Sequence, residues 1–289
     1  MKLLFADAHA HSNPVQGLGA TEIAKRFKSK GGWFIALVAL SPWHYKIDAK
    51  KGFEAYKEAY RIHIEECRRA RESGLKTACI AGFHPADVDR LRELGFDAAQ
   101  VLELGLKVVN YAAELCKQGI LDGLGEVGRQ HYNTRPENVA IAVEILMEAI
   151  RLSKDYDCIV HMHLENAGPV TVELVERARL RLGAHKELLL VHHAKPSLAS
   201  YAIERGYYTT LPGKEQILRY YFGELKGPVD KLLIESDYID DPRRPCVSSC
   251  PWEVVEREEK LYKSGIIDEE TLMRVNIDNI VKFYRVEPP

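Results

Sequence analysis

The segment LLFADAHAH (residues 3–11) places two histidines directly after a short apolar run. If that run is a β-strand, side chains two residues apart leave the same face, so His9 and His11 project side by side from its end. Neutral imidazole is a good ligand for divalent zinc, manganese or nickel, but two ligands alone hold a metal weakly. The segment therefore predicts half of a metal site, with the remaining ligands elsewhere in the chain.

Length and composition point to one soluble globular domain. The chain has 289 residues, a usual length for an α/β barrel, and its 46% hydrophobic and 28% charged residues are typical of a globular protein. A formal net charge of −2 without a basic block disfavours a protein that coats nucleic acid. The first apolar run is too short for a signal peptide, and no run would span a membrane. These features predict a cytoplasmic protein.

Six cysteines are scattered along the chain without a CxxC pair. Cys246 and Cys250 are close in sequence, but a reducing cytosol argues against a bridge. We therefore expect them to be small, half-buried side chains in a loop.

Apolar runs alternate with segments of helical periodicity along the whole chain, a pattern that indicates consecutive βα units and a parallel sheet. Strands are expected at residues 3–6, 33–40, 77–83, 120–127, 158–160, 188–191, 207–211 and 231–234. Helices are expected at 21–30, 52–73, 98–118, 137–154, 169–181, 251–264 and 268–284. Eight strands in alternation predict a single (β/α)8 TIM barrel that covers residues 1–289 as one domain.

Ionisable residues gather at the carboxyl ends of these strands, where active sites of such barrels are built. Histidine and carboxylate ligands suit a borderline divalent metal, and a shared carboxylate permits two ions roughly 3.5 to 4 Å apart. The residues in these positions are His9, His11, His84, Glu126, His161, His192, His193 and Asp237.

The two carboxylates have ordinary alternatives. Glu126 lies between glycines in GEVG, where a buried carboxylate is costly without a cation beside it, unless it occupies an exposed turn. Asp237 directly follows an apolar strand, a position that also suits a helix cap or a salt bridge.

The motifs DAHAH, GFHP, GEVGR, IVH, a histidine after the sixth strand, ESDYIDDP and NIDNIVKFY occur in this order over almost the whole chain. Together they resemble the TatD family of metal-dependent hydrolases, within the amidohydrolase superfamily. The runs GYYTTLPGK and ESDYIDDPRRP are more similar to the archaeal TatD-related branch than to the bacterial nuclease.

The resemblance implies a binuclear centre of two divalent ions, zinc first, with manganese, magnesium or nickel as alternatives. His9, His11 and Asp237 would hold one ion, a histidine after each of the fifth and sixth strands would hold the other, and Glu126 would bridge them.

Two ligand assignments stay open. His161 and His163 share a face of an extended strand; the count from Glu126 favours His161, and His163 would then contact substrate or face solvent. His192 and His193 point to opposite faces of a strand. The step to Gly206 in the archaeal pattern favours His193, whereas the nuclease pattern favours His192. We expect His193 to be the ligand and His192 to act beside it on metal affinity.

The implied chemistry is metal-assisted hydrolysis, in which water activated by a cation attacks at neutral pH. Asp237 would take up the proton and pass it to the leaving group. His84 would hydrogen-bond the oxyanion, unless it serves only as a cap before Pro85.

The leading substrate is a phosphodiester in DNA, held by basic side chains near the mouth. Arg129 is the best candidate, and Arg243 and Arg244 are others. The nuclease pattern places an arginine where this chain has His163, which argues against DNA cleavage.

The rival is an amidohydrolase-superfamily enzyme that cleaves a small cyclic amide, lactone or phosphate ester. A third possibility, a non-catalytic metal-binding scaffold, is disfavoured because the ligand set includes the base Asp237.

Overall fold

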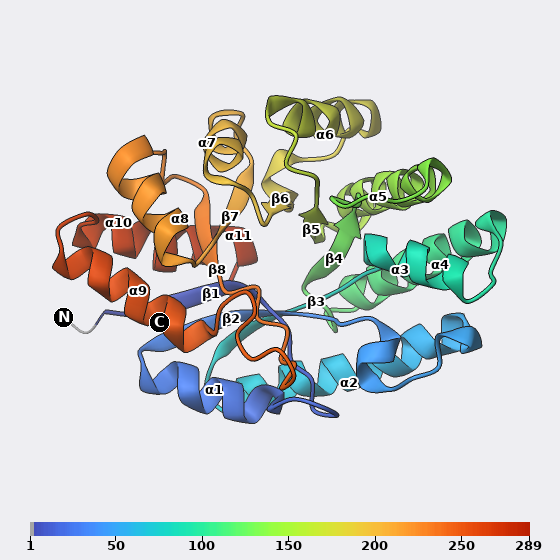
Figure 1. Ribbon diagram of the computed structural model, residues 1–289, viewed down its shortest axis with the longest axis horizontal. Coiled ribbons are helices and arrows are strands. Elements are labelled where there is room, and N and C mark those ends of the chain that lie inside the picture. Colours follow the sequence, from blue (N-terminus) through green and yellow to red (C-terminus); the bar gives the residue numbers. More distant parts are fainter. Residues whose placement is uncertain (1–2) are drawn as a thin grey trace. The chain divides into compact units, whose positions relative to one another are not determined.

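The computed structural model describes residues 3–289, and its eight strands follow one another in sequence order in one sheet. They are β1 (Phe5–Ala10), β2 (Gly32–Val38), β3 (Lys76–Ala81), β4 (Gly123–Gly128), β5 (Ile159–His163), β6 (Leu189–His192), β7 (Tyr208–Pro212) and β8 (Leu232–Glu235). Helices connect successive strands (Figure 1). This order confirms the predicted (β/α)8 barrel.

The chain divides into two compact units, which we describe in turn. The first comprises Met1–Leu37, Glu65–Ala78 and His193–Pro289. In it, β1 pairs in parallel with β2, β7 pairs with β8, and Ala10 forms a bridge with Tyr238. Its helices are α1 (Gly19–Ser29), α7 (Pro196–Glu204), α8 (Glu215–Arg219), the π-helix η4 (Tyr220–Leu225), α9 (Pro251–Lys263), α10 (Glu269–Met273), the π-helix η5 (Arg274–Asp278) and α11 (Asn279–Tyr284).

The second unit comprises Val38–Ile64 and Cys79–His192. In it, β4 pairs in parallel with both β3 and β5, and β5 pairs in parallel with β6. Figure 1 shows α4 and α5 side by side. The elements are the 3₁₀ turns η1 (Pro42–Tyr45), η2 (Ala49–Lys51) and η3 (Lys186–Leu188), and the helices α3 (Pro85–Glu93), α4 (Ala98–Lys117), α5 (Pro136–Tyr156) and α6 (Pro169–Leu182). Helix α2 (Phe53–Glu72) begins in this unit and ends in the first.

One local expectation is refined and another is wrong. The expected helix 268–284 is present as a continuous helical run over residues 269–284, in which the π-helix η5 separates α10 from α11. Cys246 and Cys250 form a disulfide, although the cytosolic argument favoured free thiols. A second disulfide joins Cys116 at the end of α4 to Cys158, which directly precedes β5.

The cores of both units are built from apolar side chains of the strands and the inward faces of the helices, including Phe5, Phe34, Ile80 and Val160. Each of these side chains is almost completely shielded from solvent. Within the described residues, no helix has the length and apolar character needed to cross a bilayer. Whether 1–289 behaves as one domain stays a prediction.

Glu258, on α9 in the first unit, has a carboxyl side chain that is completely buried. Its Oε2 accepts a hydrogen bond from Nδ2 of Asn276 at 2.6 Å, and Oδ1 of Asn276 accepts one from the backbone N–H of Ala6 at 2.9 Å. Burial, with a smaller contribution from the charge of Asp7, raises the pKa of Glu258 to about 8. The folded protein therefore keeps this carboxyl protonated at neutral pH.

The Glu258→Gln variant is expected to flatten the pH dependence of stability. Because the pKa of Glu258 is higher in the folded state, that state binds more protons, and the free energy of unfolding falls as pH rises from about 4.5 to 8. Glutamine lacks this titration, so the variant should lose less stability between about pH 5.5 and 8, by on the order of 2 kcal/mol. Urea unfolding at both pH values measures it. Glu259→Gln, which removes a surface carboxylate bonded to Lys263, is the matched control and should behave as wild type.

Candidate metal centre

Backbone hydrogen bonds align the carboxyl ends of β1 and β8 in the first unit. The Asp237 N–H donates to the His9 carbonyl at 3.0 Å, and the His11 N–H donates to the Tyr238 carbonyl at 2.7 Å. Asp237 has a φ of 51°, so the chain turns in the left-handed region there. Its Oδ1 lies 3.9 Å from Nε2 of His11, whose ring is 5.1 Å from the His9 ring. Three residues predicted to bind one metal therefore lie together.

Asp7 supports this arrangement from within the strand. Its Oδ1 accepts hydrogen bonds from the backbone N–H of His9 at 3.2 Å and of Ser236 at 2.9 Å. Burial raises the pKa of Asp7 to about 7, and the hydrogen bonds from Ser236 only partly oppose that rise. The side chain thus ties β1 to the end of β8 directly below the histidines.

His193 follows β6 and also lies against carboxylates of β8. It has a φ of 58°, and its N–H donates to Oγ1 of Thr210 at 2.9 Å. Its Nδ1 is 3.2 Å from Oε1 of Glu235 and 3.5 Å from Oδ2 of Asp237. Glu235 was missed in the sequence, although the two-residue alternation from Asp237 is a signal for it.

In the second unit, Oε2 of Glu126 is the centre of a histidine cluster. Nδ1 of His163 lies 2.7 Å from this oxygen, Nε2 of His192 lies 3.4 Å from it, and Nε2 of His84 lies 3.6 Å from it. Glu126 is only 6% exposed, so the carboxylate does not occupy an exposed turn. His161 is buried on β5, with its Cβ against Gly125 on the neighbouring strand.

Hydrogen bonds determine which nitrogen of His163 carries the proton. Burial lowers the pKa of His163 to about 4, so the ring is neutral at pH 7 and has one N–H. A carboxylate only accepts, so Nδ1 donates to Glu126, and Nε2 accepts from Nδ1 of His131 at 3.1 Å. Both nitrogens of His163 are engaged. From the sequence, His131 was expected only as one of the side chains after the fourth strand that could hold substrate; its contact with His163 was not predicted.

His84 is the N-cap of α3, and its Nδ1 accepts the backbone N–H of Ala86 at 3.0 Å. In a neutral imidazole that accepts through Nδ1, the proton is on Nε2, which here faces Glu126. Burial by itself would lower the pKa of His84. The charge and the hydrogen bond of the Glu126 carboxylate together have the larger, opposite effect, so the pKa is raised. The residue is therefore both a cap and a hydrogen-bond donor.

The arginines predicted to hold phosphate are engaged with carboxylates. Nε and Nη2 of Arg129 donate to the two oxygens of Glu165 at 2.6 and 2.8 Å. Arg243 and Arg244 both donate to Asp241 from the loop after β8. The structure thus places all three beside acidic partners.

Replacing Arg129 with methionine is expected to lower the free energy of unfolding by about 2 kcal/mol, because Glu165 loses a bidentate partner that is largely buried. If the main role of Arg129 is its ion pair with Glu165, the KM for a phosphodiester should change by less than a factor of about two. Urea unfolding and steady-state kinetics test this together. A large rise in KM with unchanged stability would instead assign Arg129 to the substrate.

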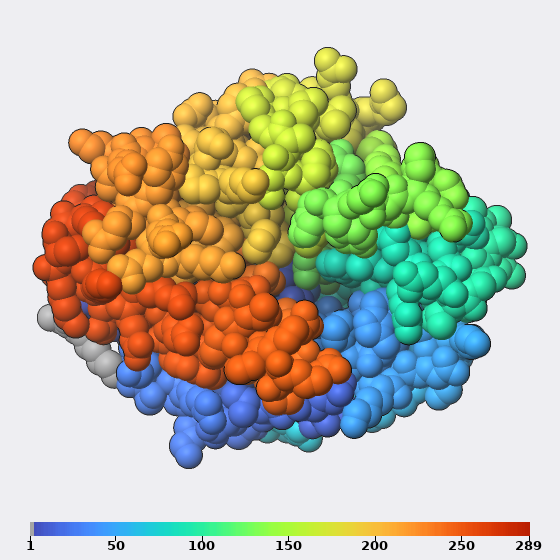
Figure 2. Space-filling view, viewed as in Figure 1, coloured from blue at the N-terminus to red at the C-terminus, as the bar shows by residue number. Residues whose placement is uncertain are grey.

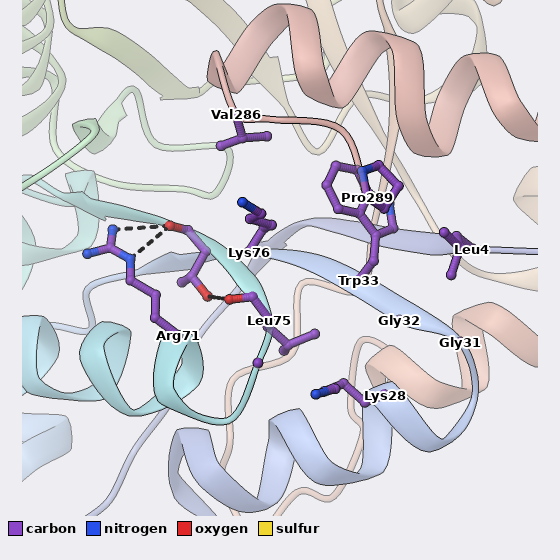
Figure 3. A pocket seen from close by; sticks show the side chains of 12 residues that line it. Leu4, Lys28, Gly31, Gly32, Trp33, Arg71, Leu75, Lys76, Val286 and Pro289 are labelled. Carbon is purple, nitrogen blue, oxygen red and sulfur yellow. Dashed lines mark hydrogen bonds between the residues drawn. The ribbon is translucent and has the colours of Figure 1, made fainter.

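A pocket of about 660 Å³ lies at the other ends of the strands in the first unit (Figure 3). It is lined by the starts of β2 and β3 and by the chain near Val286, and none of the described lining residues has an imidazole or carboxylate side chain. Lys28 donates to the Ser73 carbonyl and Arg71 to the Thr77 carbonyl. The pocket therefore lacks the groups that metal-assisted hydrolysis needs.

Comparison with known proteins gives a family. The model of the family described as TatD related DNase matches residues 6–285. An uncharacterized protein of Methanocaldococcus jannaschii is 24% identical over 284 residues, which are 97% of this chain and 95% of the relative. The human deoxyribonuclease TATDN3 is 23% identical over 224 residues, 74% of this chain and 76% of the relative.

Solved structures share the fold. The TatD-like protein of Archaeoglobus fulgidus superposes with a TM-score of 0.66 and 18% identity, covering 98% of this chain and 100% of that one. A mutant organophosphorus hydrolase of Deinococcus radiodurans gives 0.60 at 14% identity, covering 98% and 93%. With the family model matched over nearly the full length, the chain belongs to the TatD-related DNase family and is a metal-dependent hydrolase.

Proposed function

We propose that this hydrolase cleaves phosphodiester bonds in DNA, with two divalent cations as cofactors. The observation that carries the proposal is the convergence of His9, His11 and Asp237, three residues from opposite ends of the chain, on one another. In this fold, active sites lie at the carboxyl ends of the barrel strands, which is where these three residues are found.

The donor atoms suit a divalent cation. Imidazole nitrogens and carboxylate oxygens are the ligands that zinc and manganese accept, and here His9, His11 and Glu126 are buried. His9, His11 and Asp237 would hold one ion in the first unit. Glu126 and His161 would hold the other in the second, and the bridging role of Glu126 rests on the family resemblance.

Contacts of the two sixth-strand histidines support one ligand assignment. His192 lies 3.4 Å from Glu126 within the second unit, whereas His193 turns towards Glu235 and Asp237 within the first. These contacts support His192 as the metal ligand beside Glu126, whereas the sequence favoured His193. His193 would instead act beside Asp237. The count along the sequence from Glu126 favours His161 over His163, whose Nδ1 and Nε2 contact Glu126 and His131.

Cations in these positions would supply positive charge that acidifies water and polarises the phosphoryl oxygen. Asp237, partly exposed and adjacent to His11, would accept the proton of the attacking water and return it to the leaving oxygen. His84 would donate its Nε2–H to the charge that develops on the phosphoryl oxygens. The cap hydrogen bond to Nδ1 favours this tautomer and so supports a donor role for His84.

DNA as substrate is supported by the family and by the human relative named a deoxyribonuclease. The rival, a small lactone, cyclic amide or phosphate ester, is favoured by the pairing of Arg129 with Glu165 and by His163 in the place of an arginine. The cytoplasmic location also stays a prediction, and the disulfides weigh against it because such bridges are rare in reducing compartments.

The deciding experiment compares single-stranded DNA with a lactone and a phosphotriester as substrates, after removal of metal and reconstitution with zinc or manganese. DNA cleavage that needs the metal, with binding that weakens steeply as salt rises, supports the proposal. Turnover of only the small substrates would replace it with the rival function.

A further inference from the structure

Between β8 and α9 the chain reaches the surface only in part, over the orange segment that precedes the Cys246–Cys250 disulfide (Figure 2). Residues 242–245 and Val247 are exposed, whereas Ser248 is half-buried. We refer to residues 246–250, enclosed by the Cys246–Cys250 disulfide, as the bridge loop.

Ser248, in the middle of the bridge loop, contacts the predicted base. Its Oγ donates to Oδ2 of Asp237 at 3.1 Å. The other oxygen of Asp237 faces Nε2 of His11 at 3.9 Å. The hydroxyl therefore binds one carboxylate oxygen and leaves the other directed at the predicted metal ligand.

The bridge loop is closed by its own disulfide and is held on the first unit by helix α9 and by Arg257. The disulfide closes five residues into a ring, and Cys250 is also the N-cap of α9. Ser249 Oγ accepts from Nη1 of Arg257 at 2.6 Å, and the same nitrogen donates to the Gly213 carbonyl after β7 at 2.8 Å. Ser248 is thus anchored on one side by a covalent bridge and on the other by an arginine.

We propose that Ser248 is a positioning residue for Asp237 and that the Cys246–Cys250 disulfide keeps it in place. The inference rests on the proposed function, because it assumes that Asp237 binds a cation and accepts a proton. Asp237 has a left-handed backbone and a partly exposed side chain, so strand packing alone does not fix its carboxylate. A hydrogen bond to a charged acceptor restricts its rotation, and a closed loop limits the conformations of the donor.

The test measures zinc affinity as well as activity. Metal-free protein competes with a chromogenic chelator for zinc, and the same preparations hydrolyse bis(p-nitrophenyl) phosphate. Ser248→Ala is expected to weaken zinc binding and to lower kcat, each by about tenfold, as for other groups that orient metal ligands. KM should stay unchanged, and Ser248→Thr, which keeps the hydroxyl, should restore both values.

Cys246→Ser tests the bridge and leaves the Cys250 cap of α9 in place. It should change zinc affinity and kcat in the same direction as Ser248→Ala, and the double variant should lose no more than the larger single loss. Cys116→Ser is the matched control: it breaks another disulfide, beside the start of β5, and should lower thermal stability without changing either readout.

Each outcome has one meaning. Wild-type zinc affinity and kcat in Ser248→Ala would overturn the positioning role while leaving the proposed function intact. Additive losses in the double variant would overturn the role of the bridge. A wild-type protein that neither binds zinc nor hydrolyses either kind of substrate would overturn the proposed function, and the inference with it.

Discussion

Asp237→Asn is expected to lower kcat for phosphodiester hydrolysis by about a thousandfold, the range found when a general base is removed. Asparagine keeps the size and the backbone hydrogen bond to His9, but its amide does not take up the proton of the attacking water. The free energy of unfolding should change by less than about 1 kcal/mol, because Asp237 is partly exposed. Single-turnover kinetics with saturating metal, together with urea unfolding, measures both effects.

Asp230→Asn is the matched control for this variant. Asp230 precedes β8 at the opposite end of the strand, is 82% exposed, and lies 3.7 Å from Arg274. It should retain wild-type kcat. If Asp237→Asn keeps more than about a tenth of the activity at full metal occupancy, the base is another carboxylate, and Glu235 beside His193 is the next candidate.

Glu126→Ala is expected to lower the metal content from about two ions per chain to about one, and to reduce hydrolysis to background. The variant removes the only carboxylate predicted for the second ion and leaves a cluster of histidines, including His163 and His192. Elemental analysis after dialysis against zinc gives the occupancy. Glu137→Ala, which removes an exposed glutamate at the start of α5, should keep both ions. Unchanged occupancy in Glu126→Ala would contradict the predicted ligand set.

The sequence predicted the strands well because the polar residues of the site stop the apolar runs. His84 and Asp237 follow buried strands closely, Glu126 lies within β4, and the structure has all eight strands within a few residues of their expected positions. The first strand is the main exception: β1 extends to Ala10 and includes His9, since a histidine that contacts other site residues can remain buried in a strand.

Contacts between distant segments were not predictable from local pattern. Ser248 on Asp237, His131 on His163 and Arg257 on Ser249 depend on how loops fold back, and none of these loops has a periodic pattern. The argument that His192 and His193 face opposite sides assumed a continuing strand. β6 ends at His192, and His193 adopts a left-handed conformation, so both side chains reach carboxylates.

The pairing of β1 with the end of β8 has a consequence for how such proteins diversify. The spacing of His9, His11 and Asp237 is set by two adjacent main-chain hydrogen bonds rather than by the loops that follow. Apart from the bridge loop, whose Ser248 holds the Asp237 carboxylate, those loops can therefore lengthen, shorten or be grafted from another hydrolase without moving the backbone at the three residues, whereas a one-residue slip between the strands would separate all of them. Selection for a new substrate, in nature or in a library, should accordingly act on the loops and leave the strand register untouched.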